Sequence, residues 1–514
     1  MTIAQNSAAV RLLAAVWTFL RDAGRQGVLG RFFHRLGQGF SCAVRGSGLC
    51  RFLWREGTIP RSWPDSVACR LFTAVINIPC ALLQWIYRLG RRFWDGSLFC
   101  RLVAAVGGAS FFFLGLLMLA MLVAPHAMWD NLYALFGALA VTVLFLLGAA
   151  SRPKHRLELD RLGPYMTLYM GFICYGMAAS LAETMSLRFF AFHITAFLIV
   201  LVTVSAVRKY EQLQLVVAMA VFGVALAALY GCYQGYIGVE VVASQQDLTV
   251  NAGMPGRVYS FFDNPNNFAE ILVMLIPLDL ALIATSKSWR GKLWAFIALL
   301  PCVAAIGLTY SRSGWIGLAL AVIIFLGFQN WRFIPLIIVL GLLALPILPE
   351  TIYNRILTIG NTQDSSTRYR FAIYEAAANL MKDYWYRGVG LGHEVMQEVF
   401  KQNYPTMFDG NYPIHTHNNY LQMWTETGIL GLISYLALLL SQLKNGVKAF
   451  RQSTDRRVRT MLSAALAGFC GILVIGVAEY TWFYPRNMFI YFFLFGVIGA
   501  CIKLAKTERQ GSAA

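Results

Sequence analysis

The residues best suited to chemistry lie at the end of a long polar segment, residues 350–417, which separates two apolar parts of the chain. The segment closes with His415-Thr-His417-Asn-Asn419, where polar chain runs into an apolar stretch of helical length. A neutral imidazole at such a junction can accept a proton from a hydroxyl group. We therefore predict that His417 is a general base. His415 is a possible supporting residue, although side chains two residues apart rarely reach the same point.

Two other interpretations of the histidine pair stay open. The pair could bind a metal ion together with Asp409 or His393, but no third ligand occurs at a typical spacing. It could also be structural, with both rings satisfied by the loop backbone. We expect neither a metal site nor a cofactor.

Arg312 and Arg257 are the candidate ligands for an anion. Arg312 stands between two apolar stretches, where a guanidinium is costly unless an anionic group pairs with it. Arg257 precedes Asn264-Pro-Asn-Asn267, a pattern that predicts a helix with Asn264 as its N-cap and Pro265 at its first position. Helix N-termini attract anions. As alternatives, Arg312 could be an interfacial anchor and the asparagine segment only a helix cap.

Four carboxylates lie in or near apolar stretches, and we expect them to pair with arginines and stabilise a helix bundle rather than to act in catalysis. They are Glu270, Asp279, Glu426 and Glu479. Glu426, Arg368 and Asn267 complete the set of possible supporting residues.

The composition predicts an all-α, polytopic integral membrane protein. Of the 514 residues 58% are hydrophobic and only 13% are charged, about half the charged fraction of a soluble domain. The net charge of +18 does not indicate nucleic acid binding, because the Lys and Arg residues concentrate in the N-terminal arm and in alternate connections. That distribution matches the positive-inside rule and an attraction to anionic membrane lipids. The ten Cys are scattered, so we expect no disulfide framework.

About twelve transmembrane helices are predicted from stretches of bilayer length. They lie near residues 102–124, 131–150, 163–182, 188–206, 212–231, 265–285, 291–309, 313–328, 332–349, 418–443, 460–478 and 487–504. Basic clusters follow the second, fourth, sixth, eighth and tenth of these stretches. Both termini are therefore predicted in the cytoplasm, and residues 350–417 form one long extracytoplasmic loop between the ninth and tenth helices.

The chain divides into five predicted parts. Residues 1–100 form a basic cytoplasmic or interfacial arm. Its short apolar run, residues 71–87, is expected to lie in the membrane surface, with a re-entrant or spanning role as the less favoured alternative. Residues 101–264 form an N-terminal helical part, and residues 265–349 are central helices that include the Arg312 turn. Residues 350–417 are the catalytic loop. Residues 418–514 are C-terminal helices and a tail.

Several motifs together resemble the O-antigen ligase and O-antigen polymerase superfamily, over roughly residues 165–505. They are Tyr310-Ser-Arg-Ser-Gly-Trp315, the Asn-Pro-Asn helix start, Ser-Thr-Arg368-Tyr-Arg, Gly388-Val-Gly-Leu-Gly392, and His417-Asn-Asn-Tyr-Leu-Gln422 with Glu426-Thr-Gly. In one departure, Asp383-Tyr-Trp-Tyr-Arg387 stands where members of the superfamily usually carry a proline before the glycines.

The resemblance implies a metal-independent membrane glycosyltransferase of the bacterial cytoplasmic (inner) membrane. Its donor would be a glycan linked to polyprenyl diphosphate, and its acceptor a glycan, a lipid or a wall polymer. Residue by residue, His417 matches the His-Asn motif, Arg312 matches the Ser-Arg turn, and Arg257 matches the basic residue before the helix start. A polymerase of the same superfamily is an open alternative to a ligase. A secondary transporter or flippase is a more distant one, because about twelve spans also suit those folds.

Overall fold

The computed structural model describes residues 57–242, 253–330, 333–360 and 365–512, together with isolated residues between 27 and 55. Residues 1–26 of the predicted basic arm, and most of residues 28–56, therefore lie outside the described residues. The chain splits into two compact units, Met1–Ser62 and Trp63–Ala514. The first includes the short helix α4 (Thr58–Ser62), and all that follows concerns the second.

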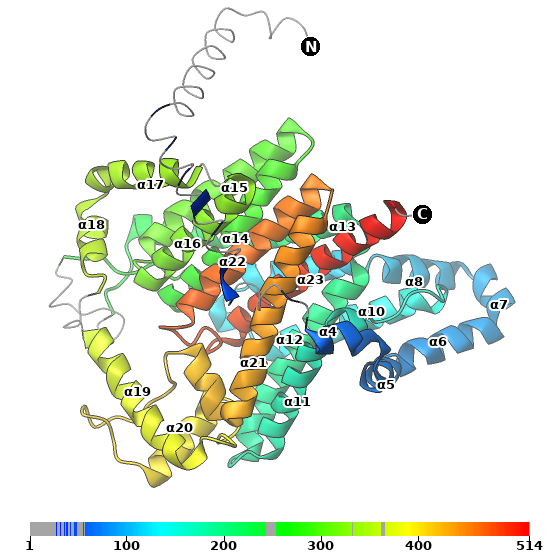
Figure 1. Cartoon of the computed structure of the whole chain (residues 1–514), viewed down its shortest axis with the longest axis horizontal. Coiled ribbons are helices and arrows are strands. Elements are labelled where there is room, and N and C mark those ends of the chain that lie inside the picture. The colour runs from blue at the N-terminus through cyan, green and yellow to red at the C-terminus, as the bar shows by residue number, and fades with distance from the viewer. Residues whose placement is uncertain are drawn as a thin grey trace, which may run out of the picture. The chain divides into compact units, whose positions relative to one another are not determined.

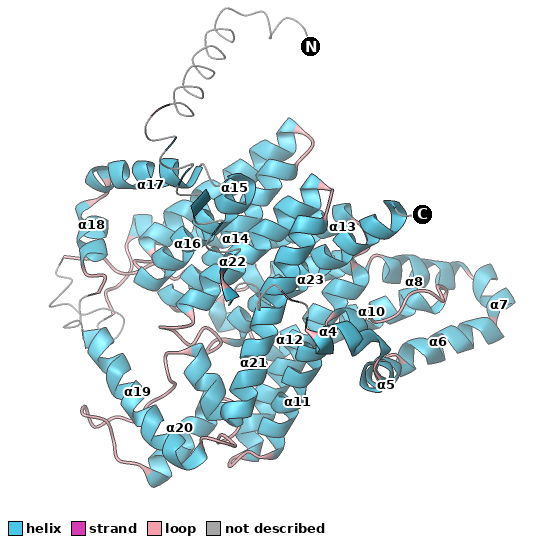
Figure 2. Ribbon diagram, viewed as in Figure 1, coloured by secondary structure: helices cyan, strands magenta, loops and turns pink. Residues whose placement is uncertain are grey.

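All regular elements of the second unit's described residues are helical, as the composition predicted (Figures 1 and 2). The helices before the asparagine segment are α5 (Val67–Ile76), α6 (Ile78–Leu89), α7 (Arg91–Gly96), α8 (Leu98–Gly108), α9 (Ser110–Val123), α10 (Asn131–Ala150), α11 (Pro164–Ala178), α12 (Glu183–Ala206) and α13 (Tyr210–Ile237). Those after it are α14 (Pro265–Thr285), α15 (Trp289–Leu308), α16 (Arg312–Asn330), α17 (Phe333–Ala344), α18 (Glu350–Leu357), α19 (Ser365–Tyr384), α20 (His393–Asn403), α21 (Asn419–Gln452), α22 (Arg456–Ile475) and α23 (Pro485–Ser512).

Helix α14 forms the centre of the bundle. It packs against α13, α15, α16, α22 and α23, and residues around its whole circumference, including the consecutive Leu272, Val273 and Met274, are fully buried. A helix that is apolar on all sides is expected in such a position. Its start is the one predicted from sequence, because Asn264 is the N-cap, its side chain accepts the N–H of Asn266, and Pro265 is the first helical residue.

Nine helices within the described residues are long and apolar enough to cross a membrane, or up to twelve if each of three bent helix pairs is one span. The bent pairs are α5 with α6 (58°), α8 with α9 (56°), and residues 337–347 with α18 (119°). The predicted spans 102–124 and 332–349 thus fall on broken helices, and span 163–182 is the 15-residue α11, which is not among the nine. Helices α5 and α6 together are long and apolar enough to be one bent span. The placement of residues 71–87 in the membrane surface therefore stays a prediction.

The polar segment 350–417 is not an irregular loop, because α18, α19 and α20 occupy much of it. On α19, Ile373, Ala376, Ala377 and Leu380 are buried at helical spacing, so that the other face can remain polar. Helix α19 packs on α21, and α20 packs on α12 and α21.

A break in α21 anchors this segment to the bundle. Gly428 has φ 73° and ψ −178°, so the helix is interrupted there. The freed carbonyl groups of Thr425 and Glu426 accept the N–H groups of Val389 and Gly390, at 2.8 and 3.2 Å. Only glycine suits the break, because a Cβ atom at this position would collide with the backbone carbonyl of Tyr386. The part of α21 before the break carries the His417-Asn-Asn start.

Candidate functional site

The start of α21 is tied to the connection between α22 and α23, residues 476–484. Asn418 caps α21 by accepting the N–H groups of Tyr420 and Leu421, and its amide donates to the carbonyl of Val477 at 2.8 Å. The N–H of Asn419 donates to the carbonyl of Gly476 at 2.8 Å. These bonds place His417 beside Glu479, although the two residues lie 62 positions apart in the chain.

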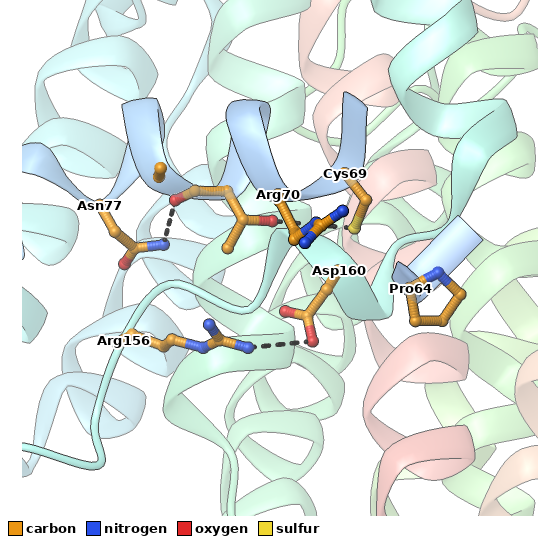
Figure 3. Close-up of a pocket in the computed structure, with 8 residues that line it drawn as sticks. Pro64, Cys69, Arg70, Asn77, Arg156 and Asp160 are labelled. Carbon is orange, nitrogen blue, oxygen red and sulfur yellow. Dashed lines mark hydrogen bonds and ion pairs between the residues drawn. The ribbon is translucent and has the colours of Figure 1, made fainter. Parts of the chain in front are cut away.

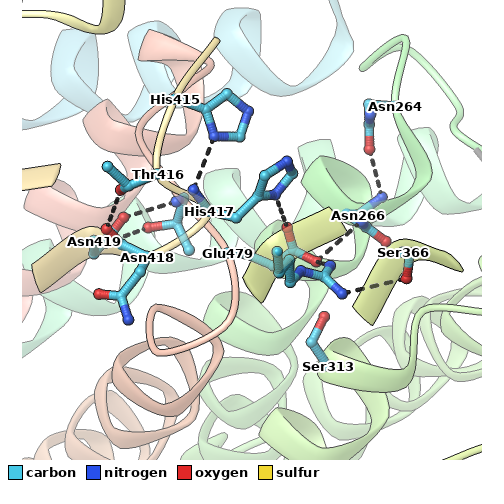
Figure 4. A network of polar contacts seen from close by, with 12 residues as sticks. Asn264, Asn266, Ser313, Ser366, His415, Thr416, His417, Asn418, Asn419 and Glu479 are labelled. Carbon is cyan, nitrogen blue, oxygen red and sulfur yellow. Dashed lines mark hydrogen bonds and ion pairs between the residues drawn. The ribbon is translucent and has the colours of Figure 1, made fainter. Parts of the chain in front are cut away.

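Glu479 is the centre of a polar network (Figure 4). One carboxylate oxygen lies 3.2 Å from Nδ1 of His417. The other accepts hydrogen bonds from Arg370 at 2.5 Å and from the Asn266 amide at 3.2 Å. Burial alone would raise the pKa of Glu479, but the positive charge of Arg370 and the hydrogen bond with His417 outweigh it and lower the pKa to about 2.

This geometry assigns the tautomer of His417. A glutamate with such a low pKa is ionised and can only accept hydrogen bonds, so Nδ1 of His417 carries the proton and donates it to Glu479. The second ring nitrogen, Nε2, is then free of a proton when the ring is neutral. A carboxylate that orients an imidazole in this way is a common arrangement around a general base.

Arg257 lies next to this network and is buried. Its Nε donates to the carbonyl of Thr309 at 2.8 Å, and its guanidinium donates to the Asn266 side-chain oxygen at 2.5 Å. Thr309 caps the C-terminus of α15, where carbonyl groups carry a partial negative charge that suits a cation. Burial, and then the nearby charge of Arg355, lower the pKa of Arg257 to about 9, and Glu479 opposes that shift.

Arg312 and Arg355 extend the group of cations. Arg312 donates to the backbone carbonyl of Thr358 at 3.1 Å and to the hydroxyl of Ser366 at 3.3 Å, and the same hydroxyl accepts a hydrogen bond from Arg370 at 3.4 Å. Arg355 is buried and donates to the carbonyl of Tyr310 at 3.4 Å. Arg312, Arg355 and Arg370 all lower the pKa of Arg257 through their charge, so the four arginines form one cluster.

The structure brings three of the predicted residues together, because Asn266 and Glu479 connect His417 to Arg257, and Ser366 connects Arg312 to Arg370. Arg368 is exposed on α19 and is not among the charged groups that act on Arg257. In the asparagine segment the side chain that enters the network belongs to Asn266. Asn267 is buried, and its carbonyl accepts a hydrogen bond from Asn487.

Two sequence expectations about nearby side chains were wrong. His415 does share a location with His417, because their ring centroids are 4.1 Å apart. The reason is the left-handed backbone of His417, with φ 46°, which reverses the chain between them. Among the residues that the structure describes, Glu479 is the only one of the four carboxylates that forms an ion pair with an arginine.

The partners of the other three carboxylates are neutral or absent. Glu426 accepts hydrogen bonds from Gln422 and Tyr480, and Glu270 accepts one from Asn487. Both carboxylate oxygens of Asp279 are buried, and neither has a hydrogen-bond partner among the described residues.

Sequence reasoning missed the roles of Arg370, Arg355, Asn266 and Glu479 in this site. From the sequence alone Glu479 is expected to be structural, and neither Arg370 nor Arg355 is assigned a role. Their pairings join segments far apart in the chain, for which a single sequence holds no signal. The amphipathic pattern of α19 could have indicated a helix, and hence that Arg370 and Ser366, four residues apart, share a face.

Among the residues that the structure describes, no group of three or more His, Cys, Asp or Glu side chains is placed to hold a metal ion. A separate pocket of about 300 Å³ lies between α5 and the chain before α11 (Figure 3). Its lining includes Arg70, Asn77 and the ion pair of Arg156 with Asp160, at 3.2 Å, and it shares no residue with the network around Glu479.

The comparison with protein families finds a similarity for part of the chain. Residues 295–436 match the family described as O-antigen ligase. This stretch is therefore similar to an O-antigen ligase domain. The matched O-antigen ligase domain includes Arg312, Arg355, Arg370 and His417, whereas Arg257, Asn266 and Glu479 lie outside it. No curated protein matches the chain.

An O-antigen ligase domain supports a function of the O-antigen ligase or polymerase type, that is, a glycosyltransferase-like enzyme of O-antigen biosynthesis. Lipid-linked glycans and glycan acceptors are the general substrates of such a domain. Together with the apolar helices, it indicates a multi-pass protein of the bacterial inner membrane.

Proposed function

We propose that this protein transfers a glycan from a polyprenyl diphosphate carrier to an acceptor hydroxyl at the outer face of the cytoplasmic membrane. His417 is the general base, and Arg257 and Arg312 hold the diphosphate. The observation that carries the proposal is the physical link between base and cations. Asn266 bonds both Glu479 and Arg257, and Arg370 bonds both Glu479 and the serine that Arg312 contacts.

In the proposed step, the acceptor oxygen attacks the anomeric carbon and forms the new glycosidic bond, while the bond from that carbon to the diphosphate oxygen breaks. The electron pair of the broken bond leaves with polyprenyl diphosphate. The acceptor proton moves to Nε2 of His417, and the resulting imidazolium is stabilised by ionised Glu479, 3.2 Å from Nδ1. General base catalysis of this kind typically contributes ~10²–10⁴ in rate.

The charge of the cluster suits the leaving group. Arg257, Arg312, Arg355 and Arg370 place four guanidinium groups close to one another and to Glu479. A diphosphate gains negative charge as it leaves, and fixed guanidinium groups stabilise that charge without reorganising during the reaction. Planar guanidinium groups also match phosphate oxygens in a bidentate geometry that lysine cannot reproduce.

A polymerase of the same superfamily is the second candidate, because the matched domain is compatible with both activities. The two differ in the acceptor, which is another lipid-linked glycan for a polymerase. A transporter would not require the pairing of an oriented imidazole with a cation cluster, so we do not favour it.

The test is transfer by the purified protein in liposomes, with undecaprenyl-diphosphate-linked O-antigen as donor and lipid A-core as acceptor. Release of undecaprenyl diphosphate reports both ligase and polymerase activity. His417→Ala should lower this release ~10²-fold or more at unchanged protein content. Arg312→Lys, which retains charge but loses the planar fork, should also be impaired.

A parallel assay with a chelator tests whether the histidine pair binds a metal ion instead. If it does, the chelator should abolish the activity of the unmutated protein. The matched control for expression and insertion is Glu183→Gln, which replaces an exposed carboxylate at the start of α12. Full activity of His417→Ala would refute the proposed mechanism.

A further inference from the structure

The backbone of His417 has an unusual conformation, and the side chain of His415 is bonded to it. We propose that His415 is a positioning residue, whose Nδ1 atom accepts the backbone N–H of His417 and so holds the His417 ring toward Glu479. This inference rests on the proposed role of His417 as the base. The hydrogen bond is 3.1 Å long.

The conformation of His417 needs support from its surroundings. Its φ of 46° lies in the left-handed region, which residues other than glycine occupy only rarely. In an extended chain, His415 and His417 would point the same way but lie about 7 Å apart. The left-handed turn brings their ring centroids to 4.1 Å and leaves the His417 ring beside Glu479.

Other groups form the neighbouring hydrogen bonds of this turn, so the specific contribution of His415 is the hydrogen bond to the backbone N–H of His417. The N–H of Thr416 donates to the Gln422 side chain at 3.0 Å, and its hydroxyl donates to the Asn418 carbonyl at 2.8 Å. The carbonyl of His417 accepts the hydroxyl of Tyr374 at 3.3 Å. Each of these partners belongs to α19, to α21 or to the turn itself.

The surroundings of His415 fit an acceptor role. Its ring lies 4.5 Å from the ring of Phe483 and 5.8 Å from that of Tyr480, measured between centroids. Burial, and then the proximity of His417 and His393, hold the pKa of His415 well below its ordinary value, with Arg370 acting in the same direction and Glu479 opposing them. A neutral ring keeps the lone pair on Nδ1 when the proton sits on Nε2. An imidazolium would direct an N–H group at the His417 N–H instead.

The experiment compares variants that separate the acceptor from the ring. In His415→Asn the side-chain oxygen can occupy the position of Nδ1, whereas in His415→Phe the ring packing on Phe483 is kept and the acceptor is lost. Release of undecaprenyl diphosphate from undecaprenyl-diphosphate-linked O-antigen is measured over a range of donor concentrations, with lipid A-core as acceptor. We expect kcat of the Phe variant to fall ~10–100-fold with little change in KM. The Asn variant should keep most of the kcat of the unmutated protein.

The outcomes are distinct. If Phe is as active as the unmutated protein, or if Asn is as impaired as Phe, the inference is wrong, because the acceptor atom would then not matter. Thermal melting of each purified variant shows whether it is folded, and His415→Leu replaces the Phe variant if that one cannot be recovered. His417→Ala in the same assay tests the base separately, so an inactive His417→Ala beside a fully active His415→Phe would remove only the role of His415.

Discussion

Replacing Glu479 with glutamine is the most informative perturbation of the site, because it changes one charge and almost no volume. The carboxylate now accepts bonds from Arg370 and Asn266 through one oxygen and from His417 through the other. In Glu479→Gln the amide oxygen satisfies Arg370, which can only donate. The amide NH₂ then faces Nδ1 of His417 and favours the tautomer that carries the proton on Nε2. In that tautomer Nε2 cannot take the proton from the hydroxyl group of the substrate.

The size of the effect follows from the ionisation of Glu479. A pKa lowered from 4.5 to about 2 corresponds to roughly 3 kcal/mol of stabilisation of the ionised form in the folded protein. Because the folded-state pKa is the lower one, this stabilisation is present above pH 4.5 and is lost as the pH falls toward 2. We expect Glu479→Gln to lower thermal stability at neutral pH and to reduce transfer ~10²–10⁴-fold.

The assay is release of undecaprenyl diphosphate at several pH values, paired with thermal melting, with Glu183→Gln as the matched control. A variant with impaired melting but normal turnover would show that Glu479 only stabilises the fold. Turnover within twofold of the unmutated protein would refute the reasoning that Glu479 sets the tautomer of His417.

Three further predictions address the cluster, the helix break and the topology. Arg370→Lys should reduce transfer about tenfold, because one ammonium group cannot reach both Glu479 and Ser366, whereas Arg368→Lys, two residues away and exposed, should transfer normally. Gly428→Ala should lose at least ~3 kcal/mol of stability in thermal melts through collision with Tyr386, and Gly410→Ala, which has a similar φ of 76° in open space, only ~1 kcal/mol. Lys401→Cys, in a background without accessible cysteines, should react with an impermeant maleimide added to intact spheroplasts, and protection there would contradict an outward-facing segment.

Local patterns in the sequence predicted most of the long apolar helices and the N-cap of α14, but they carry no information on contacts between distant segments. Asn264 and Pro265 define the start of α14 because N-capping depends on a few consecutive residues. The pairing of Glu479 with Arg370 joins the α22–α23 connection to α19, and no spacing rule relates them. Whether Arg370 or Arg368 enters the site depends on which face of α19 meets it, and a prediction of a loop over residues 350–417 cannot assign faces.

The arginine cluster costs the fold free energy, and that cost is informative about its ligand. A pKa of Arg257 lowered from 12.5 to about 9 corresponds to roughly 5 kcal/mol by which burial and neighbouring charges disfavour the charged guanidinium in the fold. The charges of Arg355, Arg312 and Arg370 contribute to this shift, and Glu479, which also binds Arg370 and His417, opposes it. A negatively charged ligand beside Arg257 would oppose the same shift, whereas a neutral glycan would not. The electrostatics of the cluster would therefore favour a diphosphate-linked donor and give it more stabilisation as its charge grows during departure.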